Sequence, residues 1–201
     1  RSLCIDRSLE DVVEEAVLGG VDVVHLRERD LSSNRLYQLA TNLRCITLGR
    51  ALLMINDRID IALAIGADGV HLPGTSIPVY AARKLVGKQL LIGKSVHSIK
   101  EAIEANSELV DYIVLGTIYK TMTHPEKSAS GPELIESVTS MIDIPVYAIG
   151  GIDARNAPEV MRAGASGIVA MRAILQAHRP EQAARILKAT LIEKHRIAGT
   201  L

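Results

Sequence analysis

Three charged residues, Arg27, Glu28 and Arg29, follow one another directly after a short apolar run. His25 stands two positions before Arg27, so on an extended strand both side chains would share one face. A run of charges is most often a solvated turn with internal ion pairs, and that interpretation stays open. The alternative is an anion site, because neighbouring guanidinium groups attract carboxylates and phosphates.

A second polar pair, Asn56 and Asp57, ends another apolar run. The structural interpretation is that the pair caps a helix beginning near Arg58. The functional interpretation is that Asp57 binds Mg²⁺ while Asn56 donates to phosphate oxygens. His71 lies in a nearly apolar stretch, and we expect it to be a core histidine whose polar atoms find partners there.

The longest polar segment, residues 117–131, contains Thr121, Thr123 and His124. Long loops between short elements are more often functional than not. Its hydroxyls and backbone N–H groups could therefore bind phosphate.

Two adjacent glycines, Gly150 and Gly151, end a further apolar run, and Arg172 follows the next one. Adjacent glycines expose backbone N–H groups that can bind a phosphate. A tight turn between a strand and a helix is the structural alternative, and Arg172 could either bind the phosphate or fill its site.

Short apolar runs that alternate with longer amphipathic stretches must position these residues. The runs are rich in β-branched residues and apolar on both faces, as expected of strands in a buried parallel sheet. Eight strands are predicted, at residues 3–5, 21–26, 51–55, 69–72, 90–93, 112–115, 146–149 and 167–170. Eight helices are predicted, at residues 9–18, 34–44, 57–65, 78–85, 99–105, 132–141, 156–163 and 180–194, with Ser33, Ser76 and Ser98 as candidate N-caps.

An internal sequence repeat indicates a repeating structural unit, because Gly66-Ala-Asp-Gly-Val70 resembles Gly164-Ala-Ser-Gly-Ile168. Strand–helix units without a linker predict an α/β fold, a single closed (β/α)8 TIM barrel forming one domain over residues 1–201. The alternative is an open doubly wound sheet, but no G-x-G-x-x-G follows the first strand. In a barrel the residues that follow the strands gather at one mouth, where function resides.

Composition excludes several classes of partner. Lys and Arg total 23, as do Asp and Glu, and the chain has five Tyr but no Phe or Trp, which argues against nucleic acid. No apolar run reaches the roughly 18 residues of a membrane span, and Cys4 and Cys45 show no CxxC spacing, so we expect a cytoplasmic protein with structural thiols. Basic residues at one mouth of a neutral chain point to a small-molecule phosphate substrate. The oligomeric state stays open, a homo-oligomer included.

From residue 3 to about residue 175 the sequence resembles the thiamine phosphate synthase family, including its TenI branch. The matching segments occur in order and at the family's spacing. They are His25-Leu-Arg-Glu-Arg29, Ile55-Asn-Asp-Arg-Ile-Asp-Ile-Ala62, Gly66-Ala-Asp-Gly-Val-His-Leu72, Gly93-Lys-Ser-Val-His97, Thr121-Met-Thr123 and Ala148-Ile-Gly-Gly-Ile152.

The synthase resemblance implies a TIM barrel that joins hydroxymethylpyrimidine diphosphate to hydroxyethylthiazole phosphate and releases pyrophosphate, with Mg²⁺ as cofactor. It implies pyrophosphate contacts from Arg27 and Asn56 and Mg²⁺ binding by Asp57. The remaining assignments are Ser95 near the pyrimidine, and Thr121, Thr123 and Gly151 at the thiazole phosphate.

Several positions depart from the synthases. His25 and Arg29 replace Gln and Lys, Ser76 replaces the second Mg²⁺ carboxylate, His124 replaces a pyrophosphate-binding Lys, and Arg172 replaces a small hydroxyl residue. We therefore expect any Mg²⁺ dependence to be weak or absent.

The pattern of departures resembles the TenI branch, which includes a thiazole tautomerase. That enzyme uses a His where this chain has Thr117, so His124 is the candidate proton carrier and His25 the candidate ring contact. The favoured hypothesis is a TenI-like tautomerase that binds a thiazole phosphate. An active thiamine phosphate synthase and a catalytically silent ligand-binding protein are the alternatives.

Overall fold

The computed structural model describes residues 3–4, 6–121 and 129–197. The chain divides into two compact units, one of Arg1–Gly93 with Ile174–Arg185 and one of Lys94–Ala173 with Ile186–Leu201. The expectation of a single domain over residues 1–201 stays a prediction.

Seven strands form a sheet in which they follow one another in chain order. They are β1 (Val23–Leu26), β2 (Leu52–Asn56), β3 (Gly69–Leu72), β4 (Leu91–Val96), β5 (Tyr112–Leu115), β6 (Val146–Ile149) and β7 (Gly167–Val169). Pairing is parallel between β1 and β2, β2 and β3, β5 and β6, and β6 and β7. The α/β class and seven of the predicted strands are thereby confirmed.

The predicted first strand, residues 3–5, is wrong in the part that the structure describes. Leu3 lies in a turn and Cys4 in a bend, and Ile5 falls outside the described residues. Asp6 adopts a left-handed φ of 51°, which ends any extended run at once. The described sheet therefore has seven strands, and the expected closed barrel of eight strands is not what forms.

The helices follow the predicted pattern with one addition. They are α1 (Leu9–Leu18), α2 (Ser33–Thr47), α3 (Ile59–Ala64), α4 (Val79–Val86), α5 (Ile99–Ser107), α6 (Glu133–Thr139), α7 (Ala157–Arg162), α8 (Arg172–Leu175) and α9 (Pro180–Ile197). The short helix α8 was not predicted, because four residues give no readable periodicity.

Serine side chains begin several helices, though not always the predicted ones. Ser98 caps α5 by accepting the N–H of Glu101 at 3.2 Å, as predicted. The cap of α2 is Ser32 rather than Ser33, because helical geometry already begins at Ser33. Ser76 caps nothing, since α4 begins after Pro78 and has no side-chain cap.

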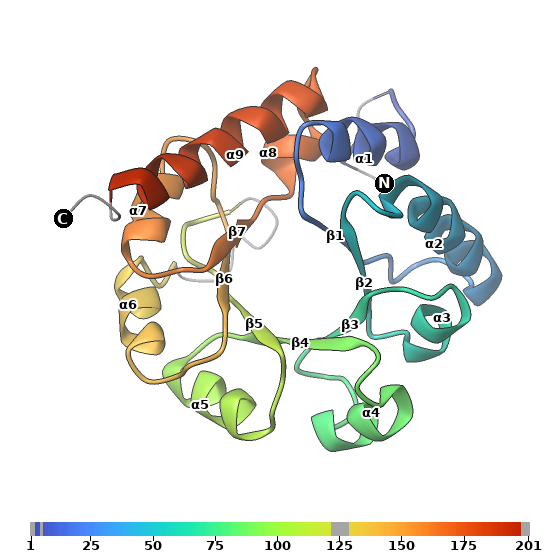
Figure 1. Ribbon diagram of the computed structural model, residues 1–201, viewed down its shortest axis with the longest axis horizontal. Coiled ribbons are helices and arrows are strands. Elements are labelled where there is room, and N and C mark those ends of the chain that lie inside the picture. The colour runs from blue at the N-terminus through green and yellow to red at the C-terminus, as the bar shows by residue number, and fades with distance from the viewer. Residues whose placement is uncertain (1–2, 5, 122–128, 198–201) are drawn as a thin grey trace. The chain divides into compact units, whose positions relative to one another are not determined.

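In the first unit, three strands pack against the helices that connect them (Figure 1). Helices α2 and α3 both contact β2, and α1 lies beside α2. The residues Leu53, Met54 and Ile55 of β2 are almost fully buried, at 0–1% exposure. Gly19, after α1, lies so close to the start of α9 that an added Cβ would meet the carbonyl oxygen of Glu181 at 2.3 Å.

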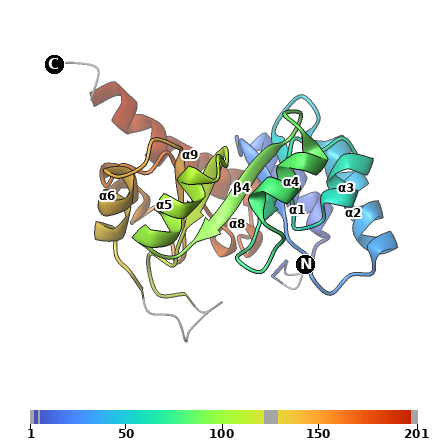
Figure 2. The ribbon, with the colours of Figure 1, turned by 90° about the horizontal axis from the view of Figure 1, so that it is seen from below.

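The second unit is organised in the same way around β5, β6 and β7. Helices α5 and α6 lie side by side (Figure 2). Ile113 and Leu115 of β5 are fully buried. The rings of Tyr112 and Tyr147, on neighbouring strands, meet edge to face with centroids 5.6 Å apart, an arrangement that aromatic quadrupoles favour.

The sequence repeat at residues 66–70 and 164–168 has the same structural role in both units. In the first, Asp68 donates its N–H to the carbonyl of Leu53 at 3.0 Å, and its carboxylate accepts the N–H of Leu53 at 2.7 Å. In the second, Ser166 does the same for Val146, with distances of 2.8 and 3.3 Å. One polar residue before each strand therefore fixes that strand against its neighbour.

The glycine that follows each of these polar residues is required by crowding. A Cβ at Gly69 would lie 2.2 Å from Cε of Met54 and 2.5 Å from the carbonyl oxygen of Leu91. A Cβ at Gly167 would lie 2.9 Å from the ring of Tyr147. Larger residues are therefore excluded where β3 and β7 begin.

Among the helices in the described part of the chain, none is both long enough and apolar enough to cross a membrane.

We predict that Gly69→Ala lowers the free energy of unfolding by about 1–3 kcal/mol, because the new methyl group overpacks against Met54 and the backbone of Leu91. The measurement is urea unfolding followed by circular dichroism. Gly74→Ala is the matched control, since nothing lies within 4 Å of its Cβ position. Equal unfolding midpoints for the two variants would contradict the packing argument.

Candidate functional site

Strand register brings polar residues together at the carboxyl ends of β1, β2 and β3. Asn56 pairs with His71, and His25, which pairs with Met54, reaches His71 through its ring. Asn56 and His71 are buried, at 9% and 2% exposure. The expectation that His71 is a core histidine is confirmed.

The two imidazoles form a pair, with ring centroids 4.7 Å apart and planes tilted by 53°. Burial lowers the pKa of His25 to about 4; the charge of Arg27 acts in the same direction, and the Asn56 side chain opposes it by hydrogen bonding. Burial lowers the pKa of His71 to about 3, with His25 contributing. Both rings are therefore neutral at pH 7.

The Nε2 atom of His25 is buried and has no hydrogen-bond partner among the described residues. A buried polar atom without a partner is destabilising unless a ligand or water satisfies it. Arg27 and Arg29, further along, are exposed as whole residues, although the Arg27 side chain is partly shielded from solvent. Burial, together with the charge of Arg29, lowers the pKa of Arg27. An anion at this end would relieve the repulsion between the two arginines.

The carboxylate of Asp57 is available for a ligand. Helix α3 begins at Ile59 after Arg58 and has no side-chain cap, so the helix-cap interpretation of Asp57 is wrong. The residue is exposed and adopts φ 65°, while its N–H donates to the carbonyl of His71 at 2.9 Å. Left-handed backbone in a residue other than glycine costs about 1–3 kcal/mol, and Asp tolerates it better than most side chains.

Among the described residues, no group of three or more His, Cys, Asp or Glu side chains could hold a metal ion. Mg²⁺, however, is commonly bound by one or two carboxylates together with substrate phosphates. Asp57 fits that mode of binding. Ser76 is half-buried and offers no carboxylate.

In the second unit, the segment after β5 runs beside the turn after β6. Ile118 donates its N–H to the carbonyl of Ile149, and Tyr119 donates to that of Gly150, both at 3.0 Å. The Tyr119 hydroxyl donates to Glu159 of α7 at 2.6 Å. Burial, together with this hydrogen bond, raises the pKa of Tyr119 to about 12, so the hydroxyl stays protonated.

Gly150 and Gly151 have φ values of 110° and 62°, which only glycine adopts freely. A Cβ at Gly151 would lie 2.7 Å from the carbonyl oxygen of Lys120 and 2.9 Å from Cβ of Tyr119. Within the described residues, the backbone N–H groups of Gly150, Gly151 and Ile152 donate to no protein group. Successive N–H groups of this kind form concave anion sites.

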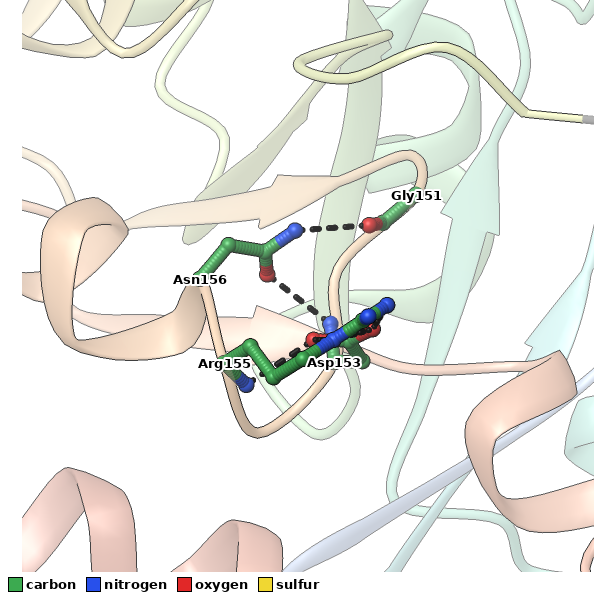
Figure 3. A network of polar contacts seen from close by, with 4 residues as sticks. All are labelled: Gly151, Asp153, Arg155 and Asn156. Atoms are coloured by element: carbon green, nitrogen blue, oxygen red, sulfur yellow. Dashed lines mark hydrogen bonds and ion pairs between the residues drawn. The ribbon is translucent and has the colours of Figure 1, made fainter.

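Figure 3 shows the side chains that close this turn. Asn156 donates from Nδ2 to the carbonyl oxygen of Gly151 at 2.9 Å, and its Oδ1 accepts the N–H of Asp153 at 2.9 Å. The carboxylate of Asp153 accepts from the backbone and guanidinium of Arg155, at 2.8 and 2.6 Å. This ion pair lowers the pKa of Asp153.

Arg172, at the start of α8, has a buried Nε that lacks a hydrogen-bond partner in the described part of the chain. Ser95, on β4, and Thr121 are half-buried. Thr123 and His124 lie outside the described residues, so their predicted roles stay predictions. The contacts of the second unit bring Gly150 and Gly151 together with residues 117–120.

Two residues that contact the candidate site residues were not predicted from the sequence. The sequence predicts only a core position for His71, although its ring contacts His25. It predicts Asn156 as the first residue of a helix. The available signal was Pro158, which removes a backbone N–H that an N-cap side chain would otherwise accept.

The histidine pair predicts acid sensitivity. On unfolding, both imidazoles return to a pKa of about 6.5, so between pH 6.5 and 4 the unfolded chain binds more protons than the folded one. The free energy of unfolding should therefore fall as the pH is lowered from 7 to 4, by up to about 1.4 kcal/mol per pH unit for each imidazole. Urea unfolding at a series of pH values measures this slope.

The variant His71→Asn should flatten that slope, whatever it does to stability at pH 7. His178→Asn is the matched control for loss of a histidine, because His178 is exposed and lies outside the pair. A slope in His71→Asn equal to that of the wild type would show that His71 is not the source.

Comparisons with known proteins agree across nearly the whole chain. The family model described as thiamine monophosphate synthase matches residues 1–174. The chain is 42% identical to a thiamine-phosphate synthase of Clostridium acetobutylicum, over 93% of this chain and 89% of that protein. It is 41% identical to one of Chloroflexus aurantiacus, over 91% and 85%.

Among solved structures, a thiamine phosphate pyrophosphorylase from Pyrococcus furiosus superimposes with a TM-score of 0.87 at 32% identity, covering 93% of this chain and 91% of that one. Sequence and fold thus point to the same set of relatives. The chain therefore belongs to the thiamine monophosphate synthase family of enzymes.

Proposed function

We propose that this enzyme is a thiamine phosphate synthase, which replaces the tautomerase hypothesis that the departures in sequence favoured. The observation that carries the proposal is identity of about 40% to proteins named thiamine-phosphate synthase over nine-tenths of the chain. In the proposed reaction, the C–O bond between the pyrimidine methylene and pyrophosphate breaks. A C–N bond to the thiazole nitrogen forms, and pyrophosphate leaves with the electron pair.

The first unit supplies groups suited to the pyrophosphate. Arg27 and Asn56 can donate to its oxygens, and the exposed guanidinium of Arg29 adds positive charge. Asp57 would hold Mg²⁺, which when bound supplies charge neutralisation for the leaving group. No nucleophilic side chain is needed, because stabilising the leaving charge is the main requirement.

The second unit supplies groups suited to the thiazole phosphate. The N–H groups of Gly150 and Gly151 have no protein acceptor within the described residues. Arg172 offers a guanidinium whose Nε also lacks one. Backbone N–H groups and a guanidinium are the usual ligands of a phosphate monoester.

The chemistry of His25 suits a ligand contact better than proton transfer. A proton carrier works best when its pKa lies near the working pH, whereas the pKa of His25 is lowered to about 4. A neutral imidazole whose buried Nε2 has no partner among the described residues is suited to hydrogen bonding with a ligand. His124 is the remaining candidate proton carrier, and a cytoplasmic location likewise stays a prediction.

The test is a coupling assay with both thiamine precursors. Purified protein mixed with the pyrimidine diphosphate, the thiazole phosphate and Mg²⁺ should form thiamine phosphate and pyrophosphate in equal amounts. The same protein given the thiazole carboxylate phosphate should not tautomerise it. Tautomerisation without coupling would restore the original hypothesis, and binding without either reaction would indicate a silent ligand-binding protein.

Asp57→Asn should lower coupling activity at least about tenfold, since the amide keeps the left-handed backbone but removes the metal-binding charge. Unfolding midpoints should match those of the wild type. Ser76→Asp tests the opposite change: a second carboxylate should reduce the Mg²⁺ concentration needed for half-maximal rate. Coupling that is insensitive to chelation and to Asp57→Asn would remove Mg²⁺ from the proposal.

A further inference from the structure

Asn156 occupies the N-cap of α7, yet its side chain caps nothing in that helix. An N-cap side chain ordinarily accepts the N–H of the second or third helical residue. The second residue here is Pro158, which has no N–H. The amide is therefore free to make contacts elsewhere.

Both ends of the Asn156 amide contact the turn after β6 instead (Figure 3). Nδ2 donates to the carbonyl oxygen of Gly151, and Oδ1 accepts the N–H of Asp153, each at 2.9 Å. In a trans peptide the C=O and N–H groups point in opposite directions. With the Gly151 carbonyl held by Asn156, the N–H of Ile152 in the same peptide must point away from Asn156.

The turn is also confined on a second side. Tyr119 and Lys120 lie so close to Gly151 that a Cβ there would be 2.9 and 2.7 Å from their atoms. Tyr119 is in turn anchored by its hydroxyl to Glu159, three residues after Asn156 in the chain. The first turn of α7 thus fixes both the peptide after Gly151 and the residue packed against it.

From this geometry we infer that Asn156 is a positioning residue of the phosphate site and that the Ile152 N–H is a third backbone donor there, beside those of Gly150 and Gly151. None of these three N–H groups has an acceptor within the described residues. Asn156 lies on the carbonyl side of the peptide and acts only through it. The inference rests on the proposed function only in placing a phosphate monoester at these glycines.

The mechanism is preorganisation. Without Asn156, the peptide between Gly151 and Ile152 can rotate, because glycine imposes little restriction of its own. Ligand binding would then have to supply the free energy that orders this peptide, and the Ile152 N–H would no longer be directed at the phosphate. The loss of binding affinity should be confined to the phosphorylated thiazole substrate.

The test compares the wild type with Asn156→Ala, which removes both contacts, and Asn156→Asp, which keeps only the acceptor for Asp153. In both variants the KM for the thiazole phosphate should rise about tenfold or more, as expected for loss of one charge-assisted hydrogen bond. The KM for the pyrimidine diphosphate and kcat should stay within about twofold. A rise seen in Asn156→Asp alone would instead indicate charge repulsion and would overturn the inference.

Arg155→Ala is the matched control, because it breaks the ion pair with Asp153 and leaves both Asn156 contacts in place. Its KM values should equal those of the wild type. A KM rise as large as that of Asn156→Ala would reduce Asn156 to a general stabiliser of the turn and would overturn the inference.

Calorimetry with inorganic phosphate separates this inference from the synthase proposal. Asn156→Ala should weaken phosphate binding about tenfold, whether or not the protein couples the thiamine precursors. It should leave binding of the unphosphorylated thiazole alcohol unchanged, an outcome that general destabilisation would not give. Equal phosphate affinity in wild type and variant, or none in the wild type, would overturn the inference.

Discussion

Strand register is the constraint on which the candidate site depends, and one side-chain contact in each unit sets it. Asp68 bonds both backbone groups of Leu53, and Ser166 bonds both backbone groups of Val146. Because side chains alternate along a strand, a slip of one residue would turn every polar side chain to the opposite face. The register fixed at Leu53 places Asn56 opposite His71, and everything at that end of the first unit follows from it.

The polar groups placed in this way are poorly satisfied by the protein itself. His25 Nε2 and Arg172 Nε are buried without partners in the described part of the chain, and Asp57 carries a strained backbone. Each feature costs stability in the free protein. Such costs are tolerated where a ligand relieves them, so we expect the substrates to bind at the least satisfied groups.

Periodicity in the sequence predicted the elements well, because short β-branched runs and amphipathic stretches differ clearly in length and period. It failed at residues 3–5, where Asp6 ends the extended conformation, and at α8, which is too short to show a pattern. The motifs indicated Asn56, Asp57, Gly150 and Gly151. They could not indicate the ring contact of His71 or the two-ended contact of Asn156, because each depends on where another strand or turn places its backbone.

Departures from a family's usual residues do not by themselves decide the reaction. In the proposed synthase, Ser76 in place of a carboxylate would leave less negative charge beside the pyrophosphate and one ligand fewer for Mg²⁺. Arg172 would add positive charge in the second unit, where the proposed ligand is also an anion. Both substitutions change the local charge around the proposed ligands, and neither adds a group that could carry a proton. A tautomerase needs such a group, and the pKa of His25, lowered to about 4, makes that residue a poor one. Neither Ser76 nor Arg172 therefore argues for proton transfer, and in the proposed synthase both would act only on the charge around the anionic substrates.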